Sequence, residues 1–499
     1  MIPRVLALTF AFALVGVTAQ AQRPGEPDPK NNTSAAVPCR SADDCPVLTL
    51  DDVRRRVLRT SPSARANRLE DQRAAAEVLN ARGGFEPALV SGYEYKTQGG
   101  KDKLNVLRSG VRWPFDLPAS PTLKVDYRRG LGSSIDPSVK TSRVGETRFG
   151  LSFSPLGGFR TDKSRAALDK AQLAPRRADA LQARKRNQLL LKASKAYWDW
   201  VKARRSLDVS HDLLQLAERR QALVTKEARA GEIPAVDSID AARTTADRQA
   251  TLEKARRTAR EKRIRLATFL WAEDGSPASF RYAAPDPDLP ASVDTLRRAE
   301  AVELARTRRP MLQVMDLKRQ KTQIEQRLAQ ERLRPKVKLE AQAVSYTDSP
   351  LNISDVKVGV EVDQPFFFRT QRSNVERAEI DLRDLELKQK VARRTVRADI
   401  ESALAALSQA RRRAQSAQRN EQLTQKLRRA EQRRFEQGEG TLFVLNKREQ
   451  SLAKARKQSI AARISALKAY ATYQWATGTI GDPYVSAESR NETGGLGGD

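Results

Sequence analysis

The chain has few of the residues that most enzyme sites use. It contains one histidine, His211, and two cysteines among 499 residues. A single histidine inside a helical pattern removes multi-histidine metal sites and His-based catalytic triads from consideration. Neither a P-loop nor a dinucleotide-binding motif is present. We therefore expect no enzymatic activity, no cofactor and no metal.

Long apolar runs are also missing. After residue 21, no run approaches the roughly 18–20 residues that a membrane-spanning helix needs. Hydrophobic residues make up 39% of the chain and charged residues 30%. This composition is too polar for a thick globular core, but it suits long helices that each bury one stripe. We expect a mainly α fold.

The charge is strongly unbalanced, with a formal value of +30 at pH 7. Such an excess is typical of nucleic-acid binding or of contact with an anionic surface. Nucleic acid is disfavoured here, because the N-terminus predicts export. Two interpretations remain open. Lys and Arg line the water-facing sides of long helices, or they form a cationic lumen or outer wall that favours anionic cargo.

Residues 1–21 have the features of a secretory signal peptide. Arg4 supplies the positive n-region, and Val5–Val17 is apolar and uncharged. Ala19-Gln20-Ala21 is an A-x-A cleavage site. The pattern predicts an exported protein.

The segment that follows this peptide and the segment at the C-terminus both have linker-like composition. Residues 22–47 form a Pro-, Asn- and Ser-rich lead that contains Cys39 and Cys45. In an oxidising, exported setting we expect these two cysteines to form a small disulfide loop. Residues 478–499 are rich in glycine and are predicted to be a mobile tail.

The region between these ends contains one architecture twice, as repeat one (48–270) and repeat two (298–477), joined by a linker at 271–297. Matching residues recur at an offset of 248 before the predicted strands and of 207 to 209 after them. The pairs are Pro62 and Pro310, Pro87 and Pro335, Phe159 and Phe368, Gly231 and Gly438. The offset falls from 248 for the first two pairs to 209 for the third, so repeat one has about 39 extra residues between its Pro87 and Phe159.

Each repeat begins with a helical pattern and then changes to period two, which predicts strands. The strands of repeat one are expected within 88–154, at 88–96, 104–113, 121–129 and 146–154. Those of repeat two are expected within 336–365. The extra residues of repeat one predict one additional hairpin or a long loop.

Two very long helices follow, at about 164–230 and 373–436, with apolar residues at heptad spacing typical of coiled coils. Each is expected to end at a glycine, Gly231 or Gly438, in the left-handed conformation. Second helices follow at 236–270 and 441–477. The tips of the two helical hairpins therefore fall at about 231–237 and 438–441.

The predicted strands suggest how the chain meets a membrane. Strands with two different faces suit a transmembrane barrel, which needs about 9–11 residues per crossing. Two to six strands cannot close a barrel alone, and an open edge in lipid leaves backbone groups unsatisfied. Several chains must then share one barrel, which the helices continue outside the membrane.

At this point the sequence resembles the outer-membrane efflux protein family, the TolC-like channels. The resemblance rests on the duplicated helix–strand–strand–helix plan over roughly 48–477 and on two local signatures. One is the strand-to-helix junction, Pro155–Arg160 and Pro365–Arg369, and the other is the hairpin tip. The resemblance implies a homotrimer whose strands form one outer-membrane barrel and whose helices form an α-barrel in the periplasm. Such a channel serves tripartite efflux or type I secretion, with a periplasmic adaptor and an inner-membrane transporter as partners and no nucleic acid.

The resemblance also assigns entrance residues. The family narrows its entrance with acidic residues after the tip glycine, a pattern that Asp237 and Asp240 match in repeat one. Phe443 and Asn446 stand near the positions where acids would be expected in repeat two. Three copies of each aspartate would attract cations at a constriction. Alternatively, these aspartates are an ordinary solvated first turn of a helix.

The tips themselves are candidate contacts for the adaptor, through Gly231, Glu232, Gly438 and Glu439. A second class of function stays open from the residues alone. An exported coiled-coil scaffold, or a basic helical protein that binds nucleic acid, would have no strands and no association with a membrane.

Overall fold

The computed structural model describes residues 46–132, 140–278, 280, 282–287, 297–346 and 353–481. The predicted signal peptide and the Cys39–Cys45 loop lie outside the described residues, and so does the predicted tail from residue 482 onward. All helices and strands described below belong to one unit that begins at Pro46.

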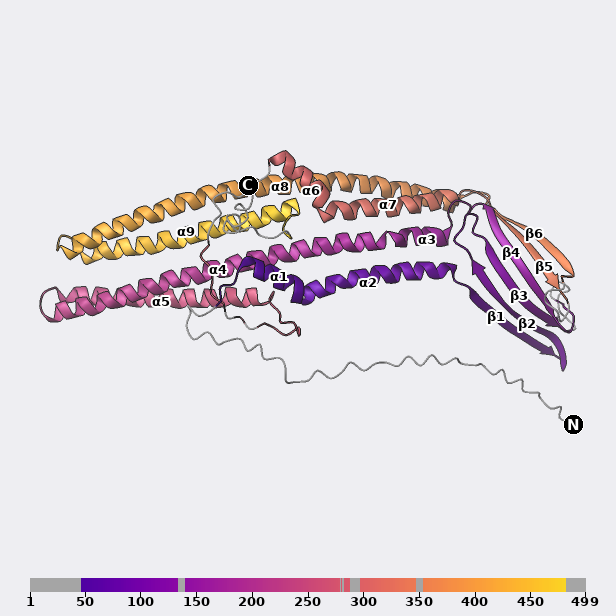
Figure 1. Ribbon diagram of the computed structural model, residues 1–499, viewed down its shortest axis with the longest axis horizontal. Coiled ribbons are helices and arrows are strands. Elements are labelled where there is room, and N and C mark those ends of the chain that lie inside the picture. The colour runs from indigo at the N-terminus through magenta and orange to yellow at the C-terminus, as the bar shows by residue number, and fades with distance from the viewer. Residues whose placement is uncertain are drawn as a thin grey trace, which may run out of the picture. The chain divides into compact units, whose positions relative to one another are not determined.

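Helices make up most of this unit (Figure 1). In repeat one they are α1 (Leu50–Thr60), α2 (Pro62–Arg82), α3 (Lys163–Gln172), α4 (Ala174–Arg229) and α5 (Ala235–Ala267). In repeat two they are α6 (Arg298–Arg308), α7 (Pro310–Glu331), α8 (Arg369–Glu436) and α9 (Leu442–Thr477). The mainly α fold and the duplicated plan are confirmed.

Proline and capping residues set the helix ends. Pro62 and Pro310 each open a second helix, because proline lacks the N–H that a helix interior needs. Thr49 caps α1 in a capping box with Asp52, and Thr441 caps α9 by accepting from the Val444 N–H at 3.4 Å. The prediction of one unbroken helix over 164–230 is wrong. The structure divides it at Leu173, because Pro175 falls in the first turn of α4.

Six strands form one antiparallel sheet in chain order. They are β1 (Ala88–Gln98), β2 (Lys101–Pro114), β3 (Thr122–Leu131), β4 (Glu146–Leu156), β5 (Lys336–Ser345) and β6 (Asp355–Asp363). β4 of repeat one pairs with β5 of repeat two, with Phe149 opposite Ala343. The extra residues of repeat one thus build strands β2 and β3 of the same sheet. Within the described residues, β1 and β6 are the two edges.

The two repeats meet again where the strands join the helices. Gly157 has a φ of +66°, and a Cβ at this position would lie 2.4 Å from the carbonyl oxygen of Pro335. Only glycine allows so close an approach together with this backbone conformation. The repeat-one strand β4 therefore leaves the sheet directly against the start of β5 in repeat two.

The largest apolar cluster lies halfway along α4. Tyr197, Trp198 and Trp200 are buried there against residues of α1, α5, α9 and the linker. Trp200 meets Phe280 of the linker edge to face, with ring centres 5.2 Å apart. The aromatic cluster is therefore a packing core, and the described part of the linker lies along α4. A second cluster joins α6, α8 and α9 around Ile400.

Candidate channel entrance and lining

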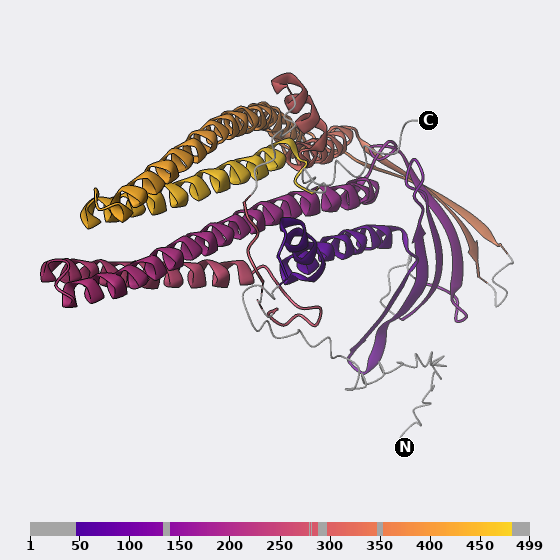
Figure 2. The ribbon, with the colours of Figure 1, turned by 60° about the vertical axis from the view of Figure 1, so that its left-hand side comes forward.

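The two helical hairpins, α4–α5 and α8–α9, end at the same end of the helical part, away from the strands (Figures 1 and 2). Gly231 and Gly438 have φ angles of +78° and +79°, as predicted for glycines that end a helix. The next amide of each tip closes the turn, from Glu232 to the Glu227 carbonyl at 3.0 Å and from Glu439 to the Arg434 carbonyl at 2.9 Å. The tips of the two repeats thus have the same geometry.

All four residues predicted to contact an adaptor are exposed at these tips: Gly231, Glu232, Gly438 and Glu439. Their exposure leaves them accessible to a partner, and their role stays a prediction.

The predicted acidic pair lies in the first turns of α5. Asp237 is half-buried, and Asp240 forms an ion pair with Arg243, whose Nη2 is 2.9 Å from Oδ1. Arg243 is also 3.7 Å from Asp247. Asp240 is therefore paired within its own helix, and Asp237 remains a candidate for attracting a cation.

Repeat two arranges its predicted residues differently. Phe443 is 70% exposed beside the tip. The side-chain oxygen of Asn446 accepts a hydrogen bond from Nη1 of Arg220 in α4, at 2.9 Å. Asn446 therefore contributes to a contact between the two hairpins.

The same contact contains a carboxylate that the sequence analysis missed. Arg220 donates two hydrogen bonds to Glu449 of α9, both of 2.5 Å. The two side chains are only 15% and 9% exposed, so the charges are sheltered from water. Glu449 falls between Leu445 and Leu452 at coiled-coil spacing, so a charged residue at a seam position was the signal that could have identified it.

Another basic group, Arg248, interacts with this carboxylate. Burial lowers the pKa of Arg248 in α5, although Asp247 and Glu449 partly oppose the effect. Burial also lowers the pKa of Lys457 in α9, and the charge of Arg248 adds to this shift. Glu449 therefore balances positive charge from α4 and α5 at the place where both hairpins meet.

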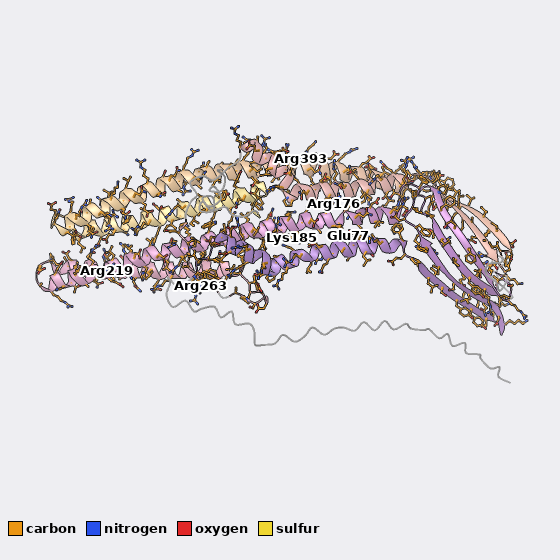
Figure 3. The ribbon with its side chains drawn as sticks, viewed as in Figure 1. Glu77, Arg176, Lys185, Arg219, Arg263 and Arg393 are labelled. Carbon is orange, nitrogen blue, oxygen red and sulfur yellow. The ribbon has the colours of Figure 1, made fainter. Side chains whose placement is uncertain are left out.

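Elsewhere the basic side chains are spread along the helices (Figure 3). Arg176, Arg219, Arg263 and Arg393 are exposed. Lys185 is exposed as well and pairs with Glu70 at 2.8 Å. This distribution agrees with Lys and Arg on water-facing helix sides.

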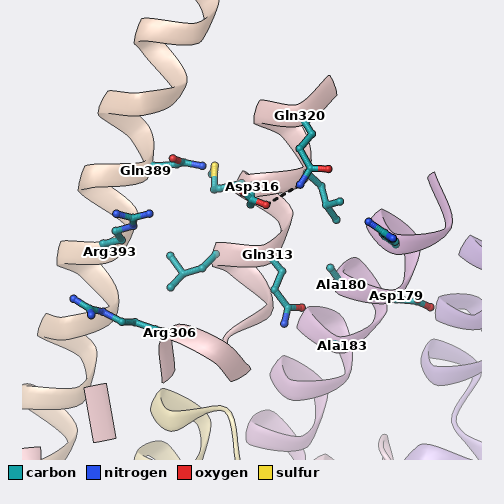
Figure 4. A pocket seen from close by; sticks show the side chains of 13 residues that line it. Asp179, Ala180, Ala183, Arg306, Gln313, Asp316, Gln320, Gln389 and Arg393 are labelled. Atoms are coloured by element: carbon teal, nitrogen blue, oxygen red, sulfur yellow. Dashed lines mark hydrogen bonds between the residues drawn. The ribbon is translucent and has the colours of Figure 1, made fainter. Parts of the chain in front are cut away.

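A hollow lies between the repeats, where α4 faces α6, α7 and α8 (Figure 4). Its volume is about 870 Å³. Asp316 accepts a hydrogen bond from Gln320 there at 2.8 Å, and Arg176 and Arg393 lie on opposite walls. Nothing in the hollow resembles a catalytic pair. Among the described residues, no three His, Cys, Asp or Glu side chains gather closely enough to hold a metal ion.

The sheet has two different faces. Residues that stand opposite each other across strands share a face. One row across all six strands is apolar: Leu89, Val111, Val125, Phe149, Ala343 and Val356. The next row, on the other face, is mostly polar: Ala88, Arg112, Lys124, Gly150, Gln342 and Lys357. The apolar side chains remain uncovered, with Val356, Val358 and Val360 65–71% exposed.

Helical hairpins and a two-faced sheet with open edges define a class of protein, the outer-membrane channels with long helical extensions. The model of the outer membrane efflux protein family matches residues 53–270 and 301–479. The chain belongs to this family, whose members are passive channels and not enzymes.

Solved structures of similar fold support this assignment. A membrane protein from Pseudomonas aeruginosa shares 18% identity over 88% of this chain and 92% of its own, with a TM-score of 0.64. The CmeC outer membrane channel of Campylobacter jejuni shares 13% identity over 89% and 88% of the two chains, with a TM-score of 0.61. The outer membrane protein VceC of Vibrio cholerae shares 15% identity over 86% and 96%, with a TM-score of 0.62.

No curated protein matches the sequence. Within the described residues, none of the helices is both long and apolar enough to traverse a bilayer.

Proposed function

We propose that three copies of this chain form the outer-membrane duct of a tripartite efflux or type I secretion system. The strands of the three copies make one barrel in the outer membrane, and the helices extend it into the periplasm. The tips at Gly231 and Gly438 meet a periplasmic adaptor bound to an inner-membrane transporter. That transporter supplies the energy, because the duct itself is passive.

The observation that carries this proposal is the sheet with one apolar face and two edge strands, β1 and β6, that have no further strand beside them in the described part of the chain. Uncovered valines on β6 suit contact with lipid, and the opposite row of charged residues suits a water-filled lumen. Within lipid, however, the backbone groups of edge strands must be paired. Another copy of the chain provides the missing partner on each edge.

The strand directions allow this closure. Because six antiparallel strands alternate in direction, β1 and β6 run oppositely. β6 of one copy can therefore pair with β1 of the next in the antiparallel sense. A ring of three copies closes with 18 strands, an even number as in other antiparallel transmembrane barrels.

One substitution on β6 tests which face meets lipid. Val360 is on the apolar face and is 65% exposed, while Glu361 is its neighbour on the polar face. Val360→Lys should reduce trimer recovery from detergent-extracted outer membranes, because a charge on the lipid side costs up to about 2–4 kcal/mol. The matched control, Glu361→Lys, introduces the same side chain on the lumen side and should leave recovery near that of the natural protein.

Light scattering of the detergent-extracted protein gives the copy number directly. A product found only in the soluble fraction as a monomer would contradict the proposal and favour the coiled-coil scaffold.

A further inference from the structure

The repeat shows which strands are additional. β5 of repeat two corresponds to β1, because Pro335 and Pro87 directly precede them at the 248 offset. β6 corresponds to β4, because Phe368 and Phe159 follow them at the 209 offset. The hairpin β2–β3 has no counterpart in repeat two. This hairpin therefore contributes side chains to the pore wall that the plan shared by both repeats does not include.

The polar face of this hairpin is strongly basic. Alternation along β2 and β3, in register with Arg112 and Lys124, places four basic residues on it: Arg108, Arg112, Lys124 and Arg128. Among the residues of β2 and β3 that pair with each other, Asp126 is the one acidic residue on that face. The carboxylate of Asp126 lies over Gly110 of β2, where a Cβ would come within 2.1 Å of Oδ1. The absence of a side chain at Gly110 thus leaves room above the sheet.

These residues line a hollow of about 310 Å³ on the polar face. Basic groups outnumber the carboxylates near it. Two of the basic groups are balanced locally, since Lys124 pairs with Glu340 at 2.7 Å and Arg128 pairs with Glu146 at 2.7 Å. Arg148, on the neighbouring strand β4, shares Glu146 at 2.5 Å.

Arg108 and Arg112 remain. Both are exposed, and neither forms an ion pair among the described residues. They stand four residues apart on the same face of β2, on either side of Gly110, and open into the hollow. Three copies around a closed wall would present six such arginines to the lumen, a ring that attracts anions and repels cations.

We propose that the hairpin β2–β3 makes the outer-membrane pore selective for anionic cargo, with Arg108 and Arg112 as the selectivity residues. The inference rests on the proposed function, because the polar face lines a lumen only if copies close the sheet. It gives the cargo a chemical class, organic or inorganic anions of more than one negative charge.

The test is single-channel recording in planar bilayers with inorganic triphosphate as the probe. α8 has 68 residues and is about 100 Å long, and its charged surface cannot cross lipid, so the barrel mouth opens to the side opposite protein addition. Triphosphate added on that side should block the natural channel. In Arg108→Gln/Arg112→Gln the half-blocking concentration of triphosphate should rise about eightfold. We count three contacts between ring arginines and the triphosphate, each exposed to water and each contributing a factor of about two to binding.

The matched control is Arg129→Gln. Arg129 is exposed and adjacent to Arg128, but it stands opposite Leu107 on the other face. Its removal changes the net charge without changing the lumen, so the half-blocking concentration should stay the same. Probing from the barrel side also separates this ring from the aspartates at the helix tips.

The outcomes separate the two claims. The selectivity proposal is overturned if the channels conduct but triphosphate does not block them. It is also overturned if Arg129→Gln weakens the block as much as Arg108→Gln/Arg112→Gln does. Either result leaves the proposed duct intact. Protein that gives no conductance steps, together with a monomeric mass in detergent, overturns the duct and this inference with it.

Discussion

The contact between Arg220 and Glu449 is expected to hold the two hairpins of one chain together near the entrance. Arg220→Met removes the partner of a carboxylate that is 9% exposed. Uncompensated charges in fully buried pairs cost about 3–5 kcal/mol. Because both side chains retain some exposure, we expect a loss near the lower limit, about 3 kcal/mol.

Hydrogen exchange on α5 and α9 measures this loss locally, because amides there exchange through opening of the hairpins. A loss of about 3 kcal/mol should speed exchange about 100-fold near Glu449, since each 1.4 kcal/mol is a factor of ten. The double variant Arg220→Met/Glu449→Gln should exchange much more slowly than the single one, because it leaves no unpaired carboxylate and Asp247 still balances Arg248. Arg219→Met is the matched control, since Arg219 is exposed and, among the described residues, donates to the Gln215 carbonyl at 3.3 Å. Equal exchange in the single and double variants would refute the reasoning.

Two further predictions concern the sheet and its junction with the helices. Deleting residues 101–139 removes the hairpin β2–β3 and leaves 12 strands in a trimer instead of 18. Barrel diameter grows roughly linearly with strand number and area grows with its square, so the pore cross-section should fall to about 0.4 of its value. The largest polyethylene glycol that enters from the barrel side measures this, and an unchanged size limit would contradict it. Asp162 caps α3 by accepting from the amides of Ser164 and Arg165 at 2.6 and 3.1 Å, so Asp162→Ala should cost about 1–2 kcal/mol in thermal unfolding. Burial alone would raise the pKa of Asp162, but hydrogen bonds from Ser120 and Arg165 outweigh it and lower the pKa. The stabilisation by Asp162 is therefore complete above the ordinary carboxyl pKa and is lost as pH falls through the lowered value. The difference in melting temperature between the natural protein and Asp162→Ala should thus shrink only in acid.

Most of the fold could be predicted because its signals are local. Pro62 and Pro310 mark helix breaks through their missing N–H, and the alternating valines of β6 mark a strand with two faces. The tip glycines could be predicted to end their helices from their position directly after a heptad pattern. The division of α3 from α4 was missed because the helical pattern continues through Pro175, although proline also favours a helix start.

The contact at the entrance could not be predicted in the same way. Arg220 and Glu449 are separated by more than 200 residues and belong to different repeats, so no local pattern pairs them. The spacing of Glu449 with its neighbouring leucines showed that it is unusual, but its partner depends on how α9 packs against α4. The ion pair of Asp240 with Arg243 follows from a three-residue spacing on one helix, but the acidic positions alone do not indicate it.

The position of α9 has a consequence for how this chain tolerates mutation. It lies between α8 and α4 (Figure 1), and from Ser459 to Thr477 buried residues occur on nearly every side of it. Ala466 and Ala471 are almost completely buried, so a larger side chain at either position would push against packed neighbours. In a saturation screen, this stretch should accept the fewest replacements, whereas the outer surface of α8 should diverge freely among relatives.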